Sequence, residues 1–232
     1  MRYRQFCALA RAAEILGERW TLLIVRELLL GPRRFTDLRA GLAGVSSSVL
    51  AGRLEAMAAS GLVRGAELPP PAAARVYELT PAGEALRGAV HELIRWGGRF
   101  LFPLRRGDAF DPRWGLLALQ ACARRRRSPR RSFTVRMRDG RREAAVGVTG
   151  GRSGTRVVEG ALAGADAVVA GPFPALLSVI AGAVTPDRAM AERLIEVSGA
   201  REAFREFPAM FEIAACAPPD GVRPAPQGAK EE

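Results

Sequence analysis

Residues 46–61, SSSVLAGRLEAMAASG, decide the fold that we expect for the first half of the chain. Leu50, Leu54 and Met57 recur at helical spacing, which predicts a helix with one apolar face. Ser46 is a favoured residue at a helix N-cap, and Gly61 ends the helix. Most of the remaining positions carry small or polar side chains, so we expect the helix to be buried on one side only.

Three shorter helices are predicted before this stretch, over residues 8–16, 20–30 and 35–42. The pair Gly31-Pro32 ends the second of them, because glycine commonly ends helices and proline cannot continue one. That helix has one apolar face, which consists of Trp20, Leu23, Ile24 and Leu28.

A hairpin and another helix follow the central stretch. Residues 62–64 and 75–79 predict two strands, and the proline-containing segment 68–74 between them fits neither a helix nor a central strand. Thr80-Pro81 is a helix cap followed by proline, and we expect that helix to continue to about Phe100. Helices, a two-stranded wing and a closing helix are the order of a winged helix-turn-helix.

The second half of the chain has a mixed pattern. Apolar and polar residues alternate on both sides of Asp139-Gly140, which predicts a hairpin. Residues 147–155 lack the Gly-Lys-[Ser/Thr] ending of a phosphate loop, so we expect another hairpin turn there. The other predicted elements are helices over 114–123, 172–182 and 200–211 and strands over 166–170 and 194–197.

We therefore expect an α+β chain with two domains. The first, residues 1–104, is the winged helix-turn-helix, with helices plus a two-stranded wing, and it supplies DNA binding and dimerisation. The second, residues 110–214, is a mixed α/β domain that binds a ligand. A proline-containing tail over 217–232 is predicted to be disordered.

Composition excludes several classes of protein. The net charge of +11, from 35 Lys and Arg against 24 Asp and Glu, favours a polyanionic partner. No run of about 18 apolar residues exists and the N-terminus lacks a secretory signal, so we expect a cytoplasmic protein without a membrane partner. One histidine and three widely spaced cysteines argue against a metal site, a catalytic triad and a disulfide framework. We expect no cofactor and no enzymatic activity.

Several motifs of the first half resemble one family, and they occur in the family's order and spacing. They are GERWTLLIVREL (17–28), GPRRFTDL (31–38), LAGRL (50–54), VYELTPAG (76–83) and HELIRWG (91–97), with Cys7 before them. Together they resemble the HxlR-type branch of winged-helix transcription regulators over residues 5–100. The resemblance implies a homodimer that binds double-stranded DNA at a palindromic operator and acts as a repressor or an activator.

Candidate DNA-binding residues lie on the central helix, before the preceding helix and on the wing. A recognition helix enters the major groove, with its N-terminal side chains near bases and phosphates. Arg53 has two interpretations, phosphate contact or an internal pair with Glu27 or Asp37. For each residue the alternative is a solvated face or a simple helix cap. The candidates are Arg33, Arg34, Ser46, Ser47, Ser48, Ala51, Gly52, Arg53, Arg64 and Arg75.

Cys7 occupies a position that some members of the family use as a thiol sensor of oxidants or electrophiles. The family often follows this cysteine with proline, whereas Ala8 follows it here. Arg2, Arg4 and Arg11 lie nearby in the sequence and favour a thiolate. The alternative is an inert cysteine at the start of a helix.

The second half loosely resembles the sterol carrier protein type 2 fold over residues 110–213. The resemblance rests on the order of elements and on the stretches 166–173, 176–182 and 195–199. It implies an apolar tunnel and a small hydrophobic ligand, whereas the alternative is a packed core without a cavity. The candidate ligand-binding residues are Phe173, Leu176, Leu177, Ile180, Phe204, Phe207 and Phe211.

The densest basic cluster is the run Arg124–Arg127 with Arg130 and Arg131. The cluster has three interpretations: it extends the contact with DNA, it pairs with acidic groups of a dimer partner, or it is a solvated loop. The interpretation that we prefer for the whole chain is a dimeric regulator whose second domain senses a small apolar molecule. Its rivals are a lipid carrier that uses the winged helix for dimerisation and an enzyme that acts on an apolar substrate.

Overall fold

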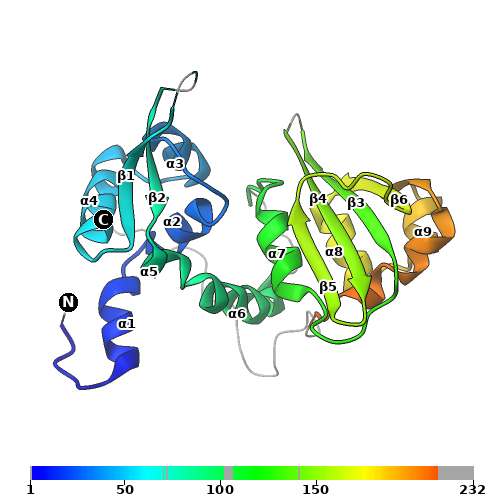
Figure 1. Cartoon of the computed structure of the whole chain (residues 1–232), viewed down its shortest axis with the longest axis horizontal. Coiled ribbons are helices and arrows are strands. Elements are labelled where there is room, and N and C mark those ends of the chain that lie inside the picture. Colours follow the sequence, from blue (N-terminus) through cyan, green and yellow to red (C-terminus); the bar gives the residue numbers. More distant parts are fainter. Residues whose placement is uncertain (1, 70, 72, 102–106, 141, 214–232) are drawn as a thin grey trace. The chain divides into compact units, whose positions relative to one another are not determined.

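The computed structural model describes residues 2–69, 71, 73–101, 107–140 and 142–213, so the predicted tail at 217–232 lies outside the described residues. The chain divides into two compact units, Met1–Val90 and His91–Glu232 (Figure 1). The boundary between the units falls inside a helix. The domain limits expected from the sequence, 1–104 and 110–214, stay a prediction.

The first unit has the element order of a winged helix-turn-helix, with helix α6 and the 3-10 turn η1 continuing into the second unit. Four helices precede a two-stranded hairpin, and a short helix follows it. The elements are α1 (Ala8–Leu16), α2 (Thr21–Leu28), α3 (Phe35–Gly41), α4 (Ser47–Ala59), β1 (Val63–Glu67), β2 (Arg75–Leu79), α5 (Pro81–Glu84), α6 (Arg87–Gly97) and η1 (Gly98–Phe100).

Helix α4 is built as the sequence predicts. The Ser46 Oγ accepts a hydrogen bond from the Val49 amide, and the buried residues of the helix are Leu50, Leu54 and Met57. The predicted face of α2 is partly wrong, because Leu23 is exposed and Val25 is buried in its place. Helix α2 therefore leaves an apolar side chain on the surface.

The wing is fixed to the rest of the first unit by backbone hydrogen bonds. Strands β1 and β2 are antiparallel, with Val63 opposite Leu79. Arg33 extends this sheet, because its amide and carbonyl both bond to the backbone of Tyr77. The short segment before α3 and the wing therefore form one surface.

The single helix predicted from Pro81 to about Phe100 is wrong. Thr80 caps a four-residue helix α5, and the chain then starts again as α6 at Arg87. A side chain at Gly83 would collide with the Leu62 carbonyl, so α5 packs closely against the start of the wing. Arg87 donates hydrogen bonds to the Leu29 carbonyl and to the Glu84 carboxylate, and these tertiary contacts fix the break.

The second unit is a five-stranded sheet with helices. The sheet order is β5-β4-β3-β6-β7; all neighbours are antiparallel except the parallel pair β3 and β6. Helix α8 packs against β3 and β6, and α7 packs against β5 (Figure 1). The elements are α7 (Trp114–Cys122), β3 (Ser132–Asp139), β4 (Arg142–Gly151), β5 (Gly154–Glu159), β6 (Ala167–Pro172), α8 (Phe173–Ile180), α9 (Pro186–Ala191), β7 (Glu196–Gly199), η2 (Arg201–Glu206) and η3 (Pro208–Met210).

Two sequence predictions for this unit need correction. Residues 200–211 form two 3-10 turns rather than one α-helix, because Pro208 lacks the amide hydrogen that a continuous helix would use. Helix α9 was not predicted, although Thr185-Pro186 starts it with the same cap and proline as Thr80-Pro81 starts α5. Within the described residues, no helix is long and apolar enough to cross a membrane.

Candidate DNA-binding surface

Helix α4 presents an exposed face of small and polar side chains. Ser47, Ser48, Ala51 and Gly52 are all exposed, and a side chain at Gly52 would meet no atom within 4 Å. Leu50 and Leu54, on the opposite side, are buried. This geometry lets the backbone of the helix come close to a flat or grooved partner.

The three serines at the start of α4 have different surroundings. Ser46 is the helix cap, so its hydroxyl is used to accept the hydrogen bond from the Val49 amide. The Ser47 Oγ accepts a hydrogen bond of 2.8 Å from the Arg39 guanidinium on α3, and the Ser48 Oγ lies 3.2 Å from the Ser46 Oγ. Ser47 and Ser48 are therefore the hydroxyls that this end of the helix presents outward.

Arg39 is a member of this surface that the sequence analysis missed. It is exposed, and its Nη1 reaches across to the first residue of α4. The signal was present in the sequence, because Leu38 of α3 and Leu42 just after it are the buried positions and Arg39 therefore points away from them. The contact with Ser47 could not be found without the packing of α3 against α4.

Arg33 and Arg34 lie at the start of α3, as predicted. Arg34 is exposed, and its amide donates to the Asp37 carboxylate, as in a capping interaction. Arg33 is only partly exposed, and its backbone is bound to β2. Arg34 is thus the better placed of the two for a partner in solution.

The structure gives Arg53 a partner that the sequence analysis did not consider. Its Nη2 lies 3.1 Å from the Glu18 carboxylate, and its side chain is only 22% exposed. Glu27 is buried and accepts hydrogen bonds from Arg26 instead. Arg53 therefore joins α4 to the segment between α1 and α2 rather than pairing with Glu27 or Asp37.

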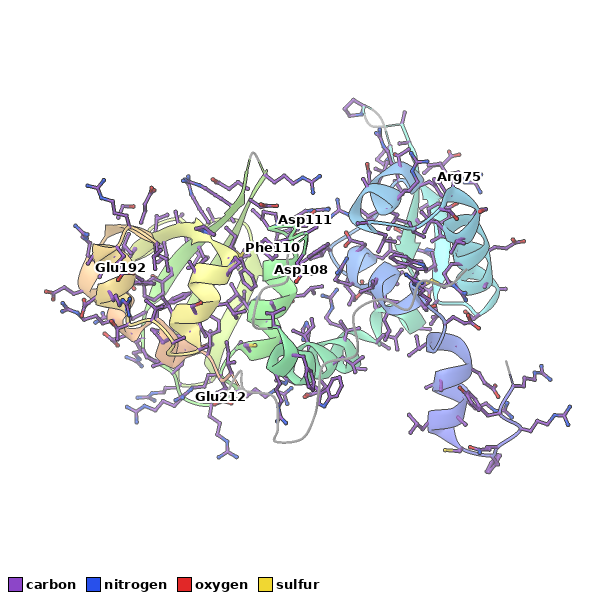
Figure 2. The ribbon with its side chains drawn as sticks, turned by 180° about the vertical axis from the view of Figure 1, so that it is seen from behind. Arg75, Asp108, Phe110, Asp111, Glu192 and Glu212 are labelled. Atoms are coloured by element: carbon purple, nitrogen blue, oxygen red, sulfur yellow. The ribbon has the colours of Figure 1, made fainter. Side chains whose placement is uncertain are left out.

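The two wing arginines differ in their charge environment. Arg64 on β1 pairs with Glu78, which stands opposite it on β2, at 2.7 Å. Arg75 is exposed beside Gly65 at the far end of the wing (Figure 2). Within the described part of the chain, its side chain forms no hydrogen bond or ion pair, so its charge is available to a partner.

Cys7 lies at the N-terminus of α1 and is exposed. The hydrogen bond from the Tyr3 amide and the one from the Arg11 guanidinium hold the pKa of the Glu14 carboxyl below its usual range. The Arg11 guanidinium therefore pairs with the Glu14 carboxylate, and the side chains of Arg2 and Arg4 are exposed. The role of Cys7 as a redox sensor stays a prediction.

All candidate ligand-binding residues of the second unit are buried. The ring centroids of Phe204 and Phe211 lie 5.5 and 5.1 Å from that of Phe207, and the ring of Phe133 on the sheet makes an edge contact with Phe207 at 5.1 Å. Helix α8 adds further buried side chains to the same interior. These are Phe173, Leu176, Leu177 and Ile180.

A separate shallow pocket of about 320 Å³ lies beside α9 and η2. Its lining includes the ion pair between Arg205 and Asp187, and none of the seven candidate ligand-binding residues lines it. In the part of the chain that the structure describes, no group of three or more His, Cys, Asp and Glu side chains is arranged to hold a metal ion.

Comparisons with known proteins agree with the geometry of the first unit. The sequence profile of the family described as HxlR-like helix-turn-helix matches residues 15–104. The uncharacterised HTH-type transcriptional regulator YvaP of Bacillus subtilis is 34% identical over 93 residues, which are 40% of this chain and 86% of that protein. The HTH-type transcriptional regulator YodB of the same organism is 33% identical over 92 residues, which are 82% of its length.

Other relatives are covered less completely. The uncharacterised HTH-type transcriptional regulator Rv3095 of Mycobacterium tuberculosis is 38% identical over 94 residues, and the chain spans 59% of its length. Among solved structures, the reduced form of YodB from B. subtilis is 30% identical with a TM-score of 0.37, covering 44% of this chain and all of that chain. The family profile ends at residue 104, before the sheet of the second unit.

Proposed function

Because the chain belongs to the HxlR-like helix-turn-helix family of transcriptional regulators, we propose that it is a homodimer that binds double-stranded DNA at a specific operator. The observation that carries this proposal is the exposed face of α4, where Ser47 and Ser48 lie one turn before the small residues Ala51 and Gly52. Side chains of this size let the helix approach base edges closely.

In the proposed complex, α4 enters the major groove. B-DNA has a major groove about 12 Å wide and about 8.5 Å deep, which admits a helix. The Ser47 and Ser48 hydroxyls face the base edges, where a hydroxyl can donate or accept a hydrogen bond. Arg34, Arg39 and Arg75 surround the helix as phosphate contacts, which position the protein without reading sequence.

The dimer is proposed from apolar side chains that the single chain leaves exposed. On α1 and just before it, Phe6 and Leu9 are fully or largely exposed, and on α6 Leu93 and Trp96 are exposed as well. Large exposed apolar side chains that gather on helices are typical of protein interfaces. A two-fold dimer requires a palindromic operator with half-sites about 34–36 Å apart.

The second unit is proposed to sense a small apolar ligand. Support comes from the order of elements, which is the order on which the resemblance to the sterol carrier fold rests apart from the additional helix α9: a helix, a hairpin, strands, helices, a strand and helical turns. Phe204, Phe207 and Phe211, between the sheet and α8, supply an apolar lining. A ligand bound there changes the separation of the two recognition helices in the dimer.

Two measurements test the proposal. Sequencing of genomic fragments retained by the full chain at moderate salt is expected to show a palindromic motif; retention without an enriched motif would contradict it and favour a lipid carrier. Native mass spectrometry is expected to show a dimer with a bound small molecule. A ligand-free protein whose affinity for the operator ignores added fatty acids would contradict the sensing role.

A further inference from the structure

Five arginines gather where the loop over residues 124–131 packs on the turn between β4 and β5. All five are exposed, and within the described residues none of them forms an ion pair or a side-chain hydrogen bond. We call this group the arginine ridge. Its members are Arg126, Arg127, Arg130, Arg152 and Arg156.

The backbone under the arginine ridge is held in place by hydrogen bonds. The Ser128 amide donates to the Gly151 carbonyl at 2.9 Å, and the Ser128 Oγ accepts from the Gly151 amide at 3.1 Å. The Thr155 amide donates to the Arg124 carbonyl at 2.7 Å, and the Gly150 amide donates to the Arg131 carbonyl at 2.8 Å. The loop therefore has a fixed conformation on the hairpin.

Two glycines make this close packing possible. A side chain at Gly154 would collide with the carbonyl of Arg124, and one at Gly150 would collide with the carbonyl of Pro129. Gly154 also has a φ of +102°, which an L side chain rarely adopts. Loop and hairpin thus bring Arg126 and Arg127 next to Arg152 and Arg156, although these pairs are far apart in the sequence.

Acidic residues neutralise the arginines around the ridge but not the ridge itself. Arg124 pairs with Glu212, which Figure 2 labels, Arg125 with Glu92, and Arg131 with Glu206. Hydrogen bonds from Arg95 and then from Arg125 hold the pKa of the Glu92 carboxyl below its usual range, so it stays charged.

The arginines on the outer side of the sheet are paired as well. Arg138 lies 2.8 Å from Glu143 and 3.8 Å from Glu196, and Arg136 lies 3.9 Å from Glu143. The ridge therefore differs from this part of the sheet, which lies at the other end of β3 and β4. Like charges held close together repel one another, and a polyanion relieves that repulsion.

We propose that the arginine ridge binds the sugar–phosphate backbone of DNA, as a second contact surface in addition to the α4 face. This inference rests on the proposed function, which brings the chain to DNA. Guanidinium groups recognise phosphates with paired hydrogen bonds, and such contacts add affinity without reading bases. The fixed loop suits this role, because its backbone is already ordered and binding does not have to order it.

The test compares two triple variants of the full chain. One removes part of the ridge, Arg126→Gln, Arg127→Gln and Arg130→Gln. The matched control, Arg188→Gln, Arg201→Gln and Arg205→Gln, removes the same number of exposed arginines from α9 and η2 of the same unit. Binding is measured by fluorescence anisotropy on a random-sequence duplex and on the selected operator, over a range of salt concentrations.

The ridge variant is expected to bind both duplexes more weakly, by the same factor. Its plot of log affinity against log salt is expected to flatten by about 0.9 for each phosphate that the ridge no longer neutralises, hence by up to about 3. The control is expected to match the wild type in slope. Unchanged thermal unfolding of both variants checks that neither change disturbs the fold.

Two results overturn the inference. A ridge variant with the wild-type slope shows that the ridge does not touch DNA. Loss of binding to vesicles rich in anionic phospholipid, with DNA binding intact, assigns the ridge to a membrane surface instead. Failure of the proposed function looks different, because the wild type itself then shows no preferred operator.

Discussion

Helices α4 and α8 are the central helices of their units, and they are buried in different ways. On α4 only Leu50, Leu54 and Met57 are buried, so most of its thirteen residues are left to solvent. Most of the eight residues of α8 are buried, including Phe173, Leu176 and Leu177. A helix buried on one face can dock against a partner, whereas a helix buried nearly all round belongs to the interior.

The difference shows where each unit carries its function. In the proposed function the first unit acts through a surface, so exposed residues such as Ser48 and Arg75 are the ones expected to decide what it binds. The candidate ligand site of the second unit is in the interior of that unit, so the room for a ligand depends on how tightly Phe207 and its neighbours pack. Each of the following predictions tests one side of this comparison.

The largest effect is expected in the interior of the second unit. Phe207→Ala removes the ring between Phe133, Phe204 and Phe211, and we expect the free energy of unfolding to fall by about 3–5 kcal/mol. Urea titration followed by circular dichroism measures it. A loss below about 1 kcal/mol, the range of conservative core changes, would contradict the close packing of these rings in the ligand-free chain.

A smaller loss of stability is expected at the start of α4. Ser46→Ala removes the side chain that caps the Val49 amide, which costs about 1 kcal/mol of unfolding free energy. Ser48→Ala is the matched control, because the Ser48 hydroxyl contacts only the Ser46 Oγ among the described residues. Equal losses for the two variants in urea titration would mean that the division between cap and contact residues is wrong.

The wing provides a test of charge at the DNA surface. Arg75→Gln is expected to flatten the salt dependence of DNA binding by about 0.9, the value for one phosphate contact. Arg64→Gln is expected to change it less, because Arg64 already pairs with Glu78. Anisotropy titrations at several salt concentrations measure both slopes, and the reverse order would contradict the charge assignment of the wing.

The smallest effect concerns pH and the edge of the second unit. The hydrogen bonds from the Ser132 amide and hydroxyl lower the pKa of the Asp166 carboxyl from its usual value. A group with a lowered folded pKa stabilises the protein above its unfolded pKa, about 3.9 for aspartate, and loses this contribution as pH falls through the folded value.

Asp166→Asn is therefore expected to lower Tm slightly at neutral pH. The difference from the wild type is expected to shrink as pH falls below about 3.9 and through the lowered folded pKa of Asp166, where the carboxyl becomes uncharged like the amide. Thermal unfolding over a pH series measures this trend. A difference that grows towards acid would contradict the assigned direction.

Local signals predicted most of the first unit. Ser46 as a cap and the spacing of Leu50, Leu54 and Met57 gave α4 its bounds and its buried face. The break between α5 and α6 could not be predicted this way, because it depends on Gly83 meeting the Leu62 carbonyl and on Arg87 reaching Leu29. Helical periodicity carries no information on such contacts.

The candidate surface was predicted residue by residue but not as a set of contacts. The sequence placed Ser47 and Arg75 correctly on the exposed side, yet it omitted Arg39 and offered the wrong internal partners for Arg53. Both errors concern side chains that meet across elements. In the second unit, the sequence showed the run Arg124–Arg127 but not its position beside Arg152 and Arg156, which the hairpin packing decides.

The most direct test of the central claim is a genome-wide fragment selection, carried out with the wild type and with the double variant Ser47→Ala, Ser48→Ala. The wild type is predicted to enrich a palindromic motif, and the variant is predicted to lose base preference at two symmetric positions while retaining affinity for duplex DNA. A wild type without an enriched motif, or a variant with an unchanged motif, would contradict the claim that α4 reads the operator.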